Sequence, residues 1–202
     1  MEKLEKTYLE KSISYSQYMQ MMHKLVSKEK TSGLDQSPEK IEYTKLNEYR
    51  MIRLEKTVHI NEYLARTVQS VSKKWIWIIL AEAWCGDVAQ NIPVLEKIAN
   101  INPLISTHYL LRDENLPLMD QYLTNGGRAI PKLICYDAET LLPIGHWGPR
   151  PLAAQQLMFD LRSQEPPLSF EEIHQPLHKW YTDNKTHDLQ NEMERLIKTW
   201  IG

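Results

Sequence analysis

One short run of residues constrains the fold of this chain more than any other. Residues 75–81, WIWIILA, are apolar on both alternating faces and rich in aromatic and β-branched side chains. This pattern is typical of a central strand that is covered on both sides. The run leads almost directly into Cys85, Gly86 and Asp87. We predict that a helix begins there, so that a cysteine lies at the junction of strand and helix.

Strand and helix patterns continue to alternate after this junction. We predict strands near residues 104–111, 131–136 and 142–147, a short helix near residues 116–123 and a further helix near residues 152–161. The last two strands can pair as a hairpin across residues 137–140. This order of elements predicts an α/β fold with a mixed sheet flanked by helices.

Helical patterns occupy both ends of the chain. Before about residue 72, apolar residues recur at spacings of three and four, and Ser37 followed by Pro38 is typical of a helix start. Near the other end, Ser169 and Glu172 fit a capping box, and Pro176 predicts the start of a last helix. We therefore divide the chain into an N-terminal helical extension (residues 1–72), a central α/β domain (73–163) and a C-terminal helical extension (164–202).

Bulk composition argues against several classes of function. The formal net charge is −2, so no general attraction to nucleic acid is expected. The longest apolar run has the length of a strand, far short of the roughly 18 residues of a membrane span, and the first residues lack the apolar core of a signal peptide. Two cysteines cannot form the disulfide framework of a small secreted domain. We therefore expect a cytoplasmic protein with neither nucleic acid nor membrane as a partner.

A cysteine in the first turn of a helix has distinctive chemistry. Unpaired backbone amides and the positive end of the helix dipole surround its sulfur and favour the thiolate over the thiol. The thiolate is the nucleophile in thiol–disulfide exchange. Beside Cys85, Gly86 would let a substrate backbone approach closely, and Trp84 would form an apolar shelf. All three are candidate site residues, with Cys85 as the catalytic one.

The segment AEAWCGDVAQNIP, residues 81–93, resembles the active-site segment of the thioredoxin superfamily, whose motif is Trp-Cys-Gly-Pro-Cys at a strand-to-helix junction. Pro93 lies eight residues after Cys85 and matches the proline that kinks the active-site helix in that family. The pair Ile130-Pro131 follows a Gly-containing turn and matches the cis-proline loop that lies against the sulfur and pairs with substrate backbone. The resemblance covers roughly residues 73–163 and implies a thioredoxin-like mixed sheet.

A narrower resemblance rests on three further segments. The run LRDE at residues 111–114, the turn TNGGRAIP and the segment GHWGPRP at residues 145–151 are similar to a bacterial group of uncharacterised thioredoxin-like proteins that pair a WCGD site with a WGPRP segment. Two interpretations of His146, Trp147 and Arg150 stay open: a rim near the site, or a structural turn held by packing of the tryptophan. Arg150 is the most interesting of the three because a guanidinium can bind a carboxylate or a thiol tripeptide.

The sequence departs from thioredoxin at three positions. Val88 stands where the resolving cysteine belongs, Asp87 replaces the intervening proline, and Ile79 occupies the position of the buried acid that assists proton transfer. Cys135 is a poor substitute, because four residues of extended strand place it roughly 13 Å beyond Pro131, and we expect it in the core. The motif itself therefore cannot form an intramolecular disulfide.

Asp87 has two opposite effects at the motif. Its carboxylate stabilises the helix end, while its negative charge raises the pKa of the nearby thiol. No histidine or lysine adjoins the motif to pair with a thiolate, so we expect a moderately activated thiol with Asp87 among the residues near substrate. We expect residues 112–114 at a solvated strand end, and His174 and His178 as surface or packing residues, with no metal site.

Two functions remain open. In the first, Cys85 attacks a protein disulfide or a mixed disulfide, Ile130-Pro131 orients the substrate backbone, and an external thiol, for example a low-molecular-weight co-substrate, resolves the product. In the second, the chain is a redox-inactive thioredoxin-fold module that binds a protein through its terminal helices. The retained residues 84–86 favour the first function, whereas Val88 and Ile79 favour the second. We expect no bound cofactor.

Overall fold

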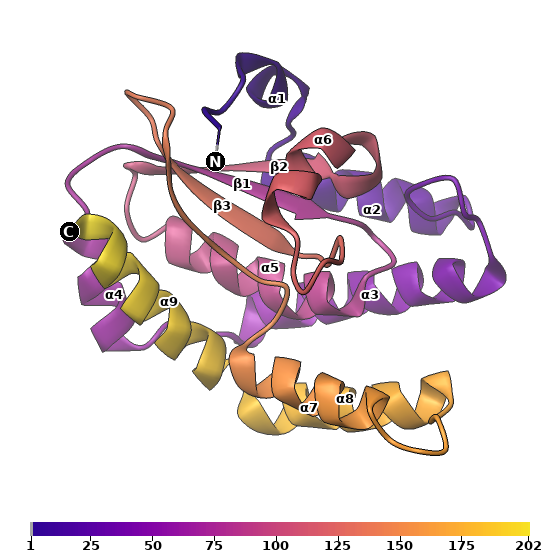
Figure 1. Cartoon of the computed structure of the whole chain (residues 1–202). Coiled ribbons are helices and arrows are strands. Elements are labelled where there is room, and N and C mark those ends of the chain that lie inside the picture. Colours follow the sequence, from indigo (N-terminus) through magenta and orange to yellow (C-terminus); the bar gives the residue numbers. More distant parts are fainter. Residues whose placement is uncertain (1) are drawn as a thin grey trace.

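The computed structural model describes residues 2–202 and has a four-stranded mixed sheet at its centre (Figure 1). The strands lie in the order β2-β1-β3-β4 and comprise β1 (Trp75–Ala81), β2 (Ile105–Leu111), β3 (Lys132–Asp137) and β4 (Pro143–Trp147). β1 runs parallel to β2 and antiparallel to β3, and β3 and β4 form the predicted hairpin. Helices flank the sheet and extend the fold at both ends of the chain, which confirms the predicted α/β class.

Strand β1 forms the centre of the core, and all seven of its residues are buried. Helix α5 (Gly86–Ala99) begins directly after Cys85, which occupies its N-cap, and Pro93 lies inside this helix. α5 packs against α3 (Pro38–Thr57), and both lie along one side of the sheet (Figure 1). The predicted junction of strand, cysteine and helix is confirmed.

Four helices precede the sheet: α1 (Lys6–Lys11), α2 (Tyr15–Ser27), α3 and α4 (Glu62–Gln69). The apolar stripe of α2 faces inward, with Tyr18 and Met22 fully buried. The Tyr18 ring lies 5.7 Å from the ring of Tyr109 in β2. Helix α3 begins at Pro38 as predicted, although the Ser37 side chain makes no capping hydrogen bond. The N-terminal helices therefore belong to the main core.

The connection between β2 and β3 is irregular. It contains a 3-10 turn (Arg112–Glu114), helix α6 (Leu116–Met119), a second 3-10 turn (Asp120–Tyr122) and a turn closed by backbone hydrogen bonds between Thr124 and Gly127. The helix predicted near residues 116–123 is thus half α-helix and half 3-10 turn. The connection ends at the peptide bond between Ile130 and Pro131, which is cis, as the resemblance implied.

The C-terminal part holds three helices, α7 (Leu152–Arg162), α8 (Phe170–Asn184) and α9 (His187–Ile201). The prediction of a last helix that begins at Pro176 is wrong. Helix α8 starts six residues earlier, because Ser169 and Glu172 form the predicted capping box, and Pro176 lies inside it. Lys185 and Thr186, which both have positive φ angles, separate α8 from α9. No helix in the described part of the chain is long and apolar enough to cross a membrane.

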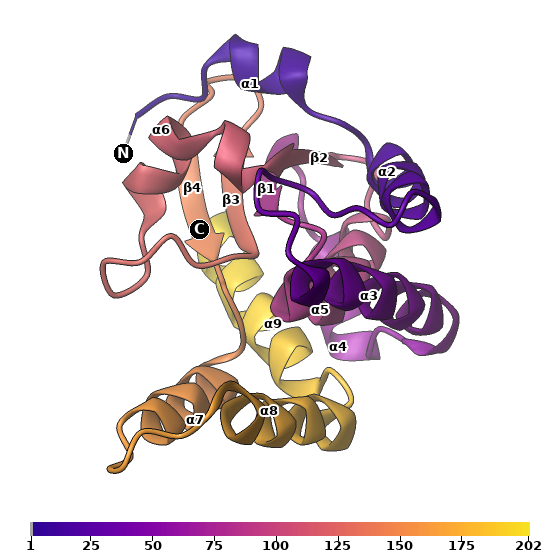
Figure 2. The ribbon, with the colours of Figure 1, turned by 90° about the vertical axis from the view of Figure 1, so that its right-hand side faces the viewer.

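Helices α7 and α8 form a hairpin that stands apart from the main core (Figure 2). This α7–α8 hairpin has a small apolar cluster of its own, made by Ala154, Met158 and Leu177. Helix α9 packs instead against α4 and β4. Polar contacts of Arg150, Tyr181 and His178 join the α7–α8 hairpin and the segment before it to α5 and α3.

Candidate functional site

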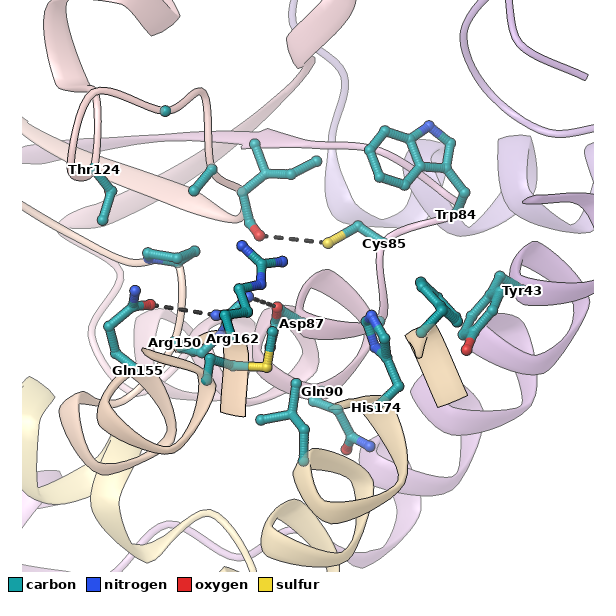
Figure 3. Close-up of a pocket in the computed structure, with 18 of the residues that line it drawn as sticks. Tyr43, Trp84, Cys85, Asp87, Gln90, Thr124, Arg150, Gln155, Arg162 and His174 are labelled. Carbon is teal, nitrogen blue, oxygen red and sulfur yellow. Dashed lines mark hydrogen bonds and ion pairs between the residues drawn. The ribbon is translucent and has the colours of Figure 1, made fainter. Parts of the chain in front are cut away.

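The Cys85 sulfur lies at the start of α5 and faces the cis-proline loop. Its Sγ donates a hydrogen bond to the Ile130 carbonyl oxygen over 3.4 Å, the contact drawn as a dashed line in Figure 3. Strand β1 ends shortly before Cys85, and β3 begins shortly after Ile130. Because β1 and β3 are neighbours in the sheet, the two residues lie close together. The two elements that the resemblance implied for the site are thus in contact.

A cavity of about 740 Å³ opens beside this sulfur. Of the seven residues proposed from the sequence, six line it, and the exception is the buried Pro131: the six are Trp84, Cys85, Gly86, Asp87, Ile130 and Arg150. The α7–α8 hairpin supplies a further part of the wall, which Figure 3 shows with Gln155, Arg162 and His174. The cavity therefore lies between the start of α5, the cis-proline loop, α3 and the α7–α8 hairpin.

The carboxylate of Asp87 joins the start of α5 to the α7–α8 hairpin. One oxygen accepts a charge-assisted hydrogen bond from the Arg150 guanidinium, and the other accepts a 2.6 Å bond from the Tyr181 hydroxyl. The side chains of Asp87 and Arg150 are only 8% and 12% exposed. Asn91, one turn further along α5, donates to the Tyr181 oxygen over 3.0 Å. Arg150 therefore reaches the site, but its partner is an acid of the motif itself.

Burial is the largest influence on the Cys85 thiol. Burial and the nearby Asp87 charge raise its pKa, while the amides of Val88 and Asp87 and the Arg150 guanidinium lower it. The balance raises the pKa of Cys85 to about 12. The expectation of a moderately activated thiol is therefore wrong. Cys85 is half-buried at the cavity wall, and this burial, which the sequence pattern does not reveal, outweighs the effect of the helix end on the thiol pKa.

The side chains of Arg50 and His178 lie close to Gly86 in the first turn of α5, and the space would also admit a side-chain carbon in ordinary van der Waals contact. A side-chain carbon at this position would lie 3.5 Å from Arg50 Nη1 and 3.9 Å from His178 Nε2. Burial and the Arg50 charge lower the pKa of His178 to about 4, so that its ring is neutral at pH 7. No histidine or lysine adjoins the motif in sequence, yet the fold places an arginine and a histidine there.

Two cations lie over the ring of Trp84. Lys40 Nζ is 4.4 Å and Arg112 Cζ is 5.2 Å from the centre of its ring, as in cation–π contacts. Its Nε1 is buried and has no hydrogen-bond partner among residues 2–202. The expectation that Arg112 lies at a solvated strand end is wrong, since its side chain is 18% exposed and lies over Trp84.

The segment WGPRP lies against the cis-proline loop as the resemblance implied. Gly148 has a φ of 114°, and any side chain there would collide with the Pro131 carbonyl. Trp147 donates a 2.8 Å hydrogen bond from Nε1 to Glu192 of α9, and His146 is exposed with its ring 5.5 Å from that of Tyr122. Of the three residues weighed in this segment, only Arg150 lines the cavity.

A buried acid lies close to the motif despite Ile79. Glu82 is fully buried three residues before Cys85. Its carboxylate accepts hydrogen bonds from Ser32 Oγ and, over 2.9 Å, from the amide of Asp113, and burial raises its pKa. The sequence signal was a single acid in an otherwise apolar run. Cys135, by contrast, is buried within β3 as predicted.

Several aromatic and basic residues of the cavity wall belong to no sequence motif, and the sequence analysis did not predict them as site residues. Phe170 and His174 of α8 stack with ring centroids 3.9 Å apart, and the Tyr43 ring of α3 meets Phe170 edge-on at 5.9 Å. Arg162 comes from the last turn of α7. Nothing in residues 2–202 groups three or more His, Cys, Asp or Glu side chains as ligands for a metal ion.

A family model described as thioredoxin matches residues 33–165, more than half of the chain. The chain belongs to this thioredoxin family. The match extends from just before α3, in the helices that precede the sheet, to just beyond α7. No curated protein matches the sequence significantly.

Two solved structures share the thioredoxin-like fold of this chain. One is a protein of unknown function, PA1234, from Pseudomonas aeruginosa, with 17% sequence identity and a TM-score of 0.57. The other is an HIV epitope scaffold with 17% identity and a TM-score of 0.55. Each comparison covers 92% of this chain and 98% of the other. At this identity the likeness concerns the fold alone.

Proposed function

We propose that this thioredoxin-family protein carries out monothiol thiol–disulfide exchange through Cys85, with an external thiol as the resolving partner. The observation that carries the proposal is the position of the sulfur, at the N-cap of α5, 3.4 Å from the Ile130 carbonyl and at the wall of a cavity of about 740 Å³. A substrate in that cavity would meet the sulfur directly. Trp84, Gly86 and Arg150 would border it.

The exchange needs one sulfur of the protein, one outside disulfide and one outside thiol. The Cys85 thiolate attacks one sulfur of a disulfide, a new sulfur–sulfur bond forms, and the departing thiolate takes up the proton that Cys85 released. An external thiolate then attacks the bound sulfur and sets Cys85 free. Cys135 cannot resolve the mixed disulfide from its place in the core. Low-molecular-weight thiols are the simplest external partner.

The electrostatics of the site favour the protonated thiol of Cys85 over the thiolate. With a pKa of about 12, Cys85 is protonated at pH 7 and donates to the Ile130 carbonyl. The amides of Asp87 and Val88 and the Arg150 guanidinium favour the charged sulfur. Reaction therefore depends on a substrate that is held against the sulfur, where proximity compensates for a small thiolate fraction.

A redox-inactive module that binds a peptide or protein is the second candidate. The observation that favours it is the raised pKa of Cys85, because a pure binding module has no use for a thiolate. The terminal helices would then supply the interface. In this function the cavity binds a partner without any covalent step.

Trapping of a mixed disulfide separates the two candidates. The Cys135→Ser protein is incubated at pH 8 with 2-hydroxyethyl disulfide or with insulin, and the reaction is quenched with acid. Intact mass spectrometry then measures the mass of the protein. Exchange predicts one adduct at Cys85 that an added thiol removes, and none in the variant that also carries Cys85→Ser. An adduct that forms only after the protein is unfolded in urea would support the redox-inactive module.

A further inference from the structure

The cavity beside Cys85 is closed on the side away from the sheet. The α7–α8 hairpin faces the sulfur across it and is tied to α5 by the contacts of Asp87 with Arg150 and Tyr181. A second contact joins α8 to α3, where His178 lies 3.2 Å from Arg50 Nη2. The hairpin covers one side of the cavity beside Cys85 and so restricts the approach of a folded protein to the sulfur.

The backbone that would pair with a protein substrate is also covered. In the thioredoxin resemblance, the residue before the cis-proline pairs with substrate backbone, and that residue here is Ile130. It is only 4% exposed, and its carbonyl already accepts from Cys85. A volume of about 740 Å³ lies instead in the range of roughly 300–1,000 Å³ that is typical of small-molecule sites.

Cations outnumber carboxylates on the wall of this cavity. Five basic side chains and three acidic ones line it: Lys40, Arg112, Arg128, Arg150 and Arg162 against Asp35, Glu39 and Asp87. Most of the cations are already paired, Arg150 with Asp87 and Arg128 with Asp120 at 2.6 Å. Arg162 forms no ion pair with any residue from 2 to 202. A guanidinium is therefore available for a carboxylate of the ligand.

The wall also offers exposed apolar surface. Phe159 and Phe170, from α7 and α8, are exposed large side chains that line the cavity. They suit the methylene or peptide part of a ligand that carries its charge at the ends. Arg162 lies between these two residues in the sequence, so charge and apolar surface come from the same hairpin.

We infer that the substrate of Cys85 is a small disulfide with carboxylate groups, of about the size of a short peptide, bound between Cys85 and the α7–α8 hairpin. This inference rests on the proposed exchange function. Cys85 attacks one sulfur of the bound disulfide, half of the molecule stays on the protein, and the other half leaves as a small thiol with the proton from Cys85. A different external thiol then attacks the sulfur of the bound half, Cys85 leaves as the thiol with the proton of the attacking group, and the product is a mixed disulfide of the two small thiols.

Rates with probes of different charge test the inference. The Cys135→Ser protein is mixed with glutathione disulfide (anionic), 2-hydroxyethyl disulfide (neutral), cystamine (cationic) or insulin, and adduct formation at Cys85 is followed by mass spectrometry. Each rate constant is divided by that of the urea-unfolded chain, which removes the intrinsic reactivity of the probe. We expect the anionic probe to be favoured over cystamine and over insulin by at least about tenfold, a difference of about 1.4 kcal/mol.

A charge substitution on the hairpin gives a second readout. Arg162→Gln should lower the rate with glutathione disulfide about threefold or more and leave the rate with 2-hydroxyethyl disulfide unchanged. Arg195→Gln removes an equal charge from an exposed position on α9, outside the cavity, and should change neither rate. Equal normalised rates for all small probes, or a preference for insulin, would overturn the substrate class while the exchange function stands. No adduct with any probe would contradict the exchange function itself.

Discussion

The Tyr181 hydroxyl donates a 2.6 Å hydrogen bond to Asp87, across 94 residues of sequence. This bond joins α8 to the first turn of the helix that carries Cys85, and the Arg150 guanidinium holds the other oxygen of the same carboxylate. Asp87 stands where thioredoxin has the proline of its motif. One of the three positions that depart from the thioredoxin motif, Asp87, therefore fastens the α7–α8 hairpin to the start of α5.

Removal of the Asp87 charge should destabilise the fold. In Asp87→Asn the buried Arg150 guanidinium loses its counter-charge, and breaking a buried pair from one side costs about 3–5 kcal/mol. Urea unfolding measures the change in free energy. The control Asp183→Asn, at an exposed pair with Lys179, should cost less than about 1 kcal/mol. Equal stability of the two variants would show that the Asp87 pair does not hold the hairpin.

Loss of the Tyr181 hydroxyl should loosen the α7–α8 hairpin without emptying its core. Tyr181→Phe keeps the ring and removes the hydrogen bond to the carboxylate, which is worth about 1.5–3 kcal/mol. Amide hydrogen exchange in α7 and α8 should become faster, while exchange in β1 stays slow. Tyr63→Phe, at an exposed tyrosine on α4, is the matched control and should leave the pattern unchanged.

The Cys85 thiol should ionise only at high pH. In the Cys135→Ser protein, the rate of alkylation by iodoacetamide should rise about tenfold per pH unit from pH 7 to 10 without a plateau, because the folded pKa is about 12. The folded state also keeps this proton above about pH 8.5, where an unfolded thiol loses it, so Cys85 lowers the stability of the fold as pH rises beyond that value. A plateau in the alkylation rate near pH 7 would contradict the raised pKa of Cys85.

Lys132 should make a pH-dependent contribution of the opposite sign. Its side chain is buried with 1% exposure, and Nζ donates only to neutral acceptors, Thr124 Oγ1 at 2.7 Å and the Gly148 carbonyl at 3.2 Å. Burial lowers its pKa to about 8. Between that value and about 10.4, the unfolded state binds more protons, so the fold gains stability as pH rises. Urea unfolding at pH 7 and pH 10 should show this gain in the parent relative to Lys132→Met, and an equal difference at both pH values would contradict it.

Local patterns in the sequence predict the centre of this fold well. The run at residues 75–81 is apolar on both faces because it is a central strand. The place where this apolar run ends marks the start of the next helix, with Cys85 at its N-cap. The cis bond before Pro131 follows from the family resemblance. These features depend on residues that are close in sequence or on a shared motif.

The far wall of the site could not be predicted in the same way. Nothing near Phe170 or Arg162 in the sequence indicates that the hairpin lies opposite Cys85, because that placement depends on the long-range contact between Asp87 and Tyr181. The direction of the shift in the thiol pKa has the same origin. Burial under elements from another part of the chain outweighs the helix end that the local pattern reveals.

The central claim is that the native fold disfavours the free thiolate of Cys85 and yet promotes its exchange with a bound disulfide. The most direct test compares the Cys135→Ser protein in its native and urea-unfolded states at pH 7.5, with iodoacetamide and with glutathione disulfide. The account predicts that the native protein reacts more slowly than the unfolded chain with iodoacetamide but faster with glutathione disulfide. A native protein that reacts more slowly with both reagents would contradict it.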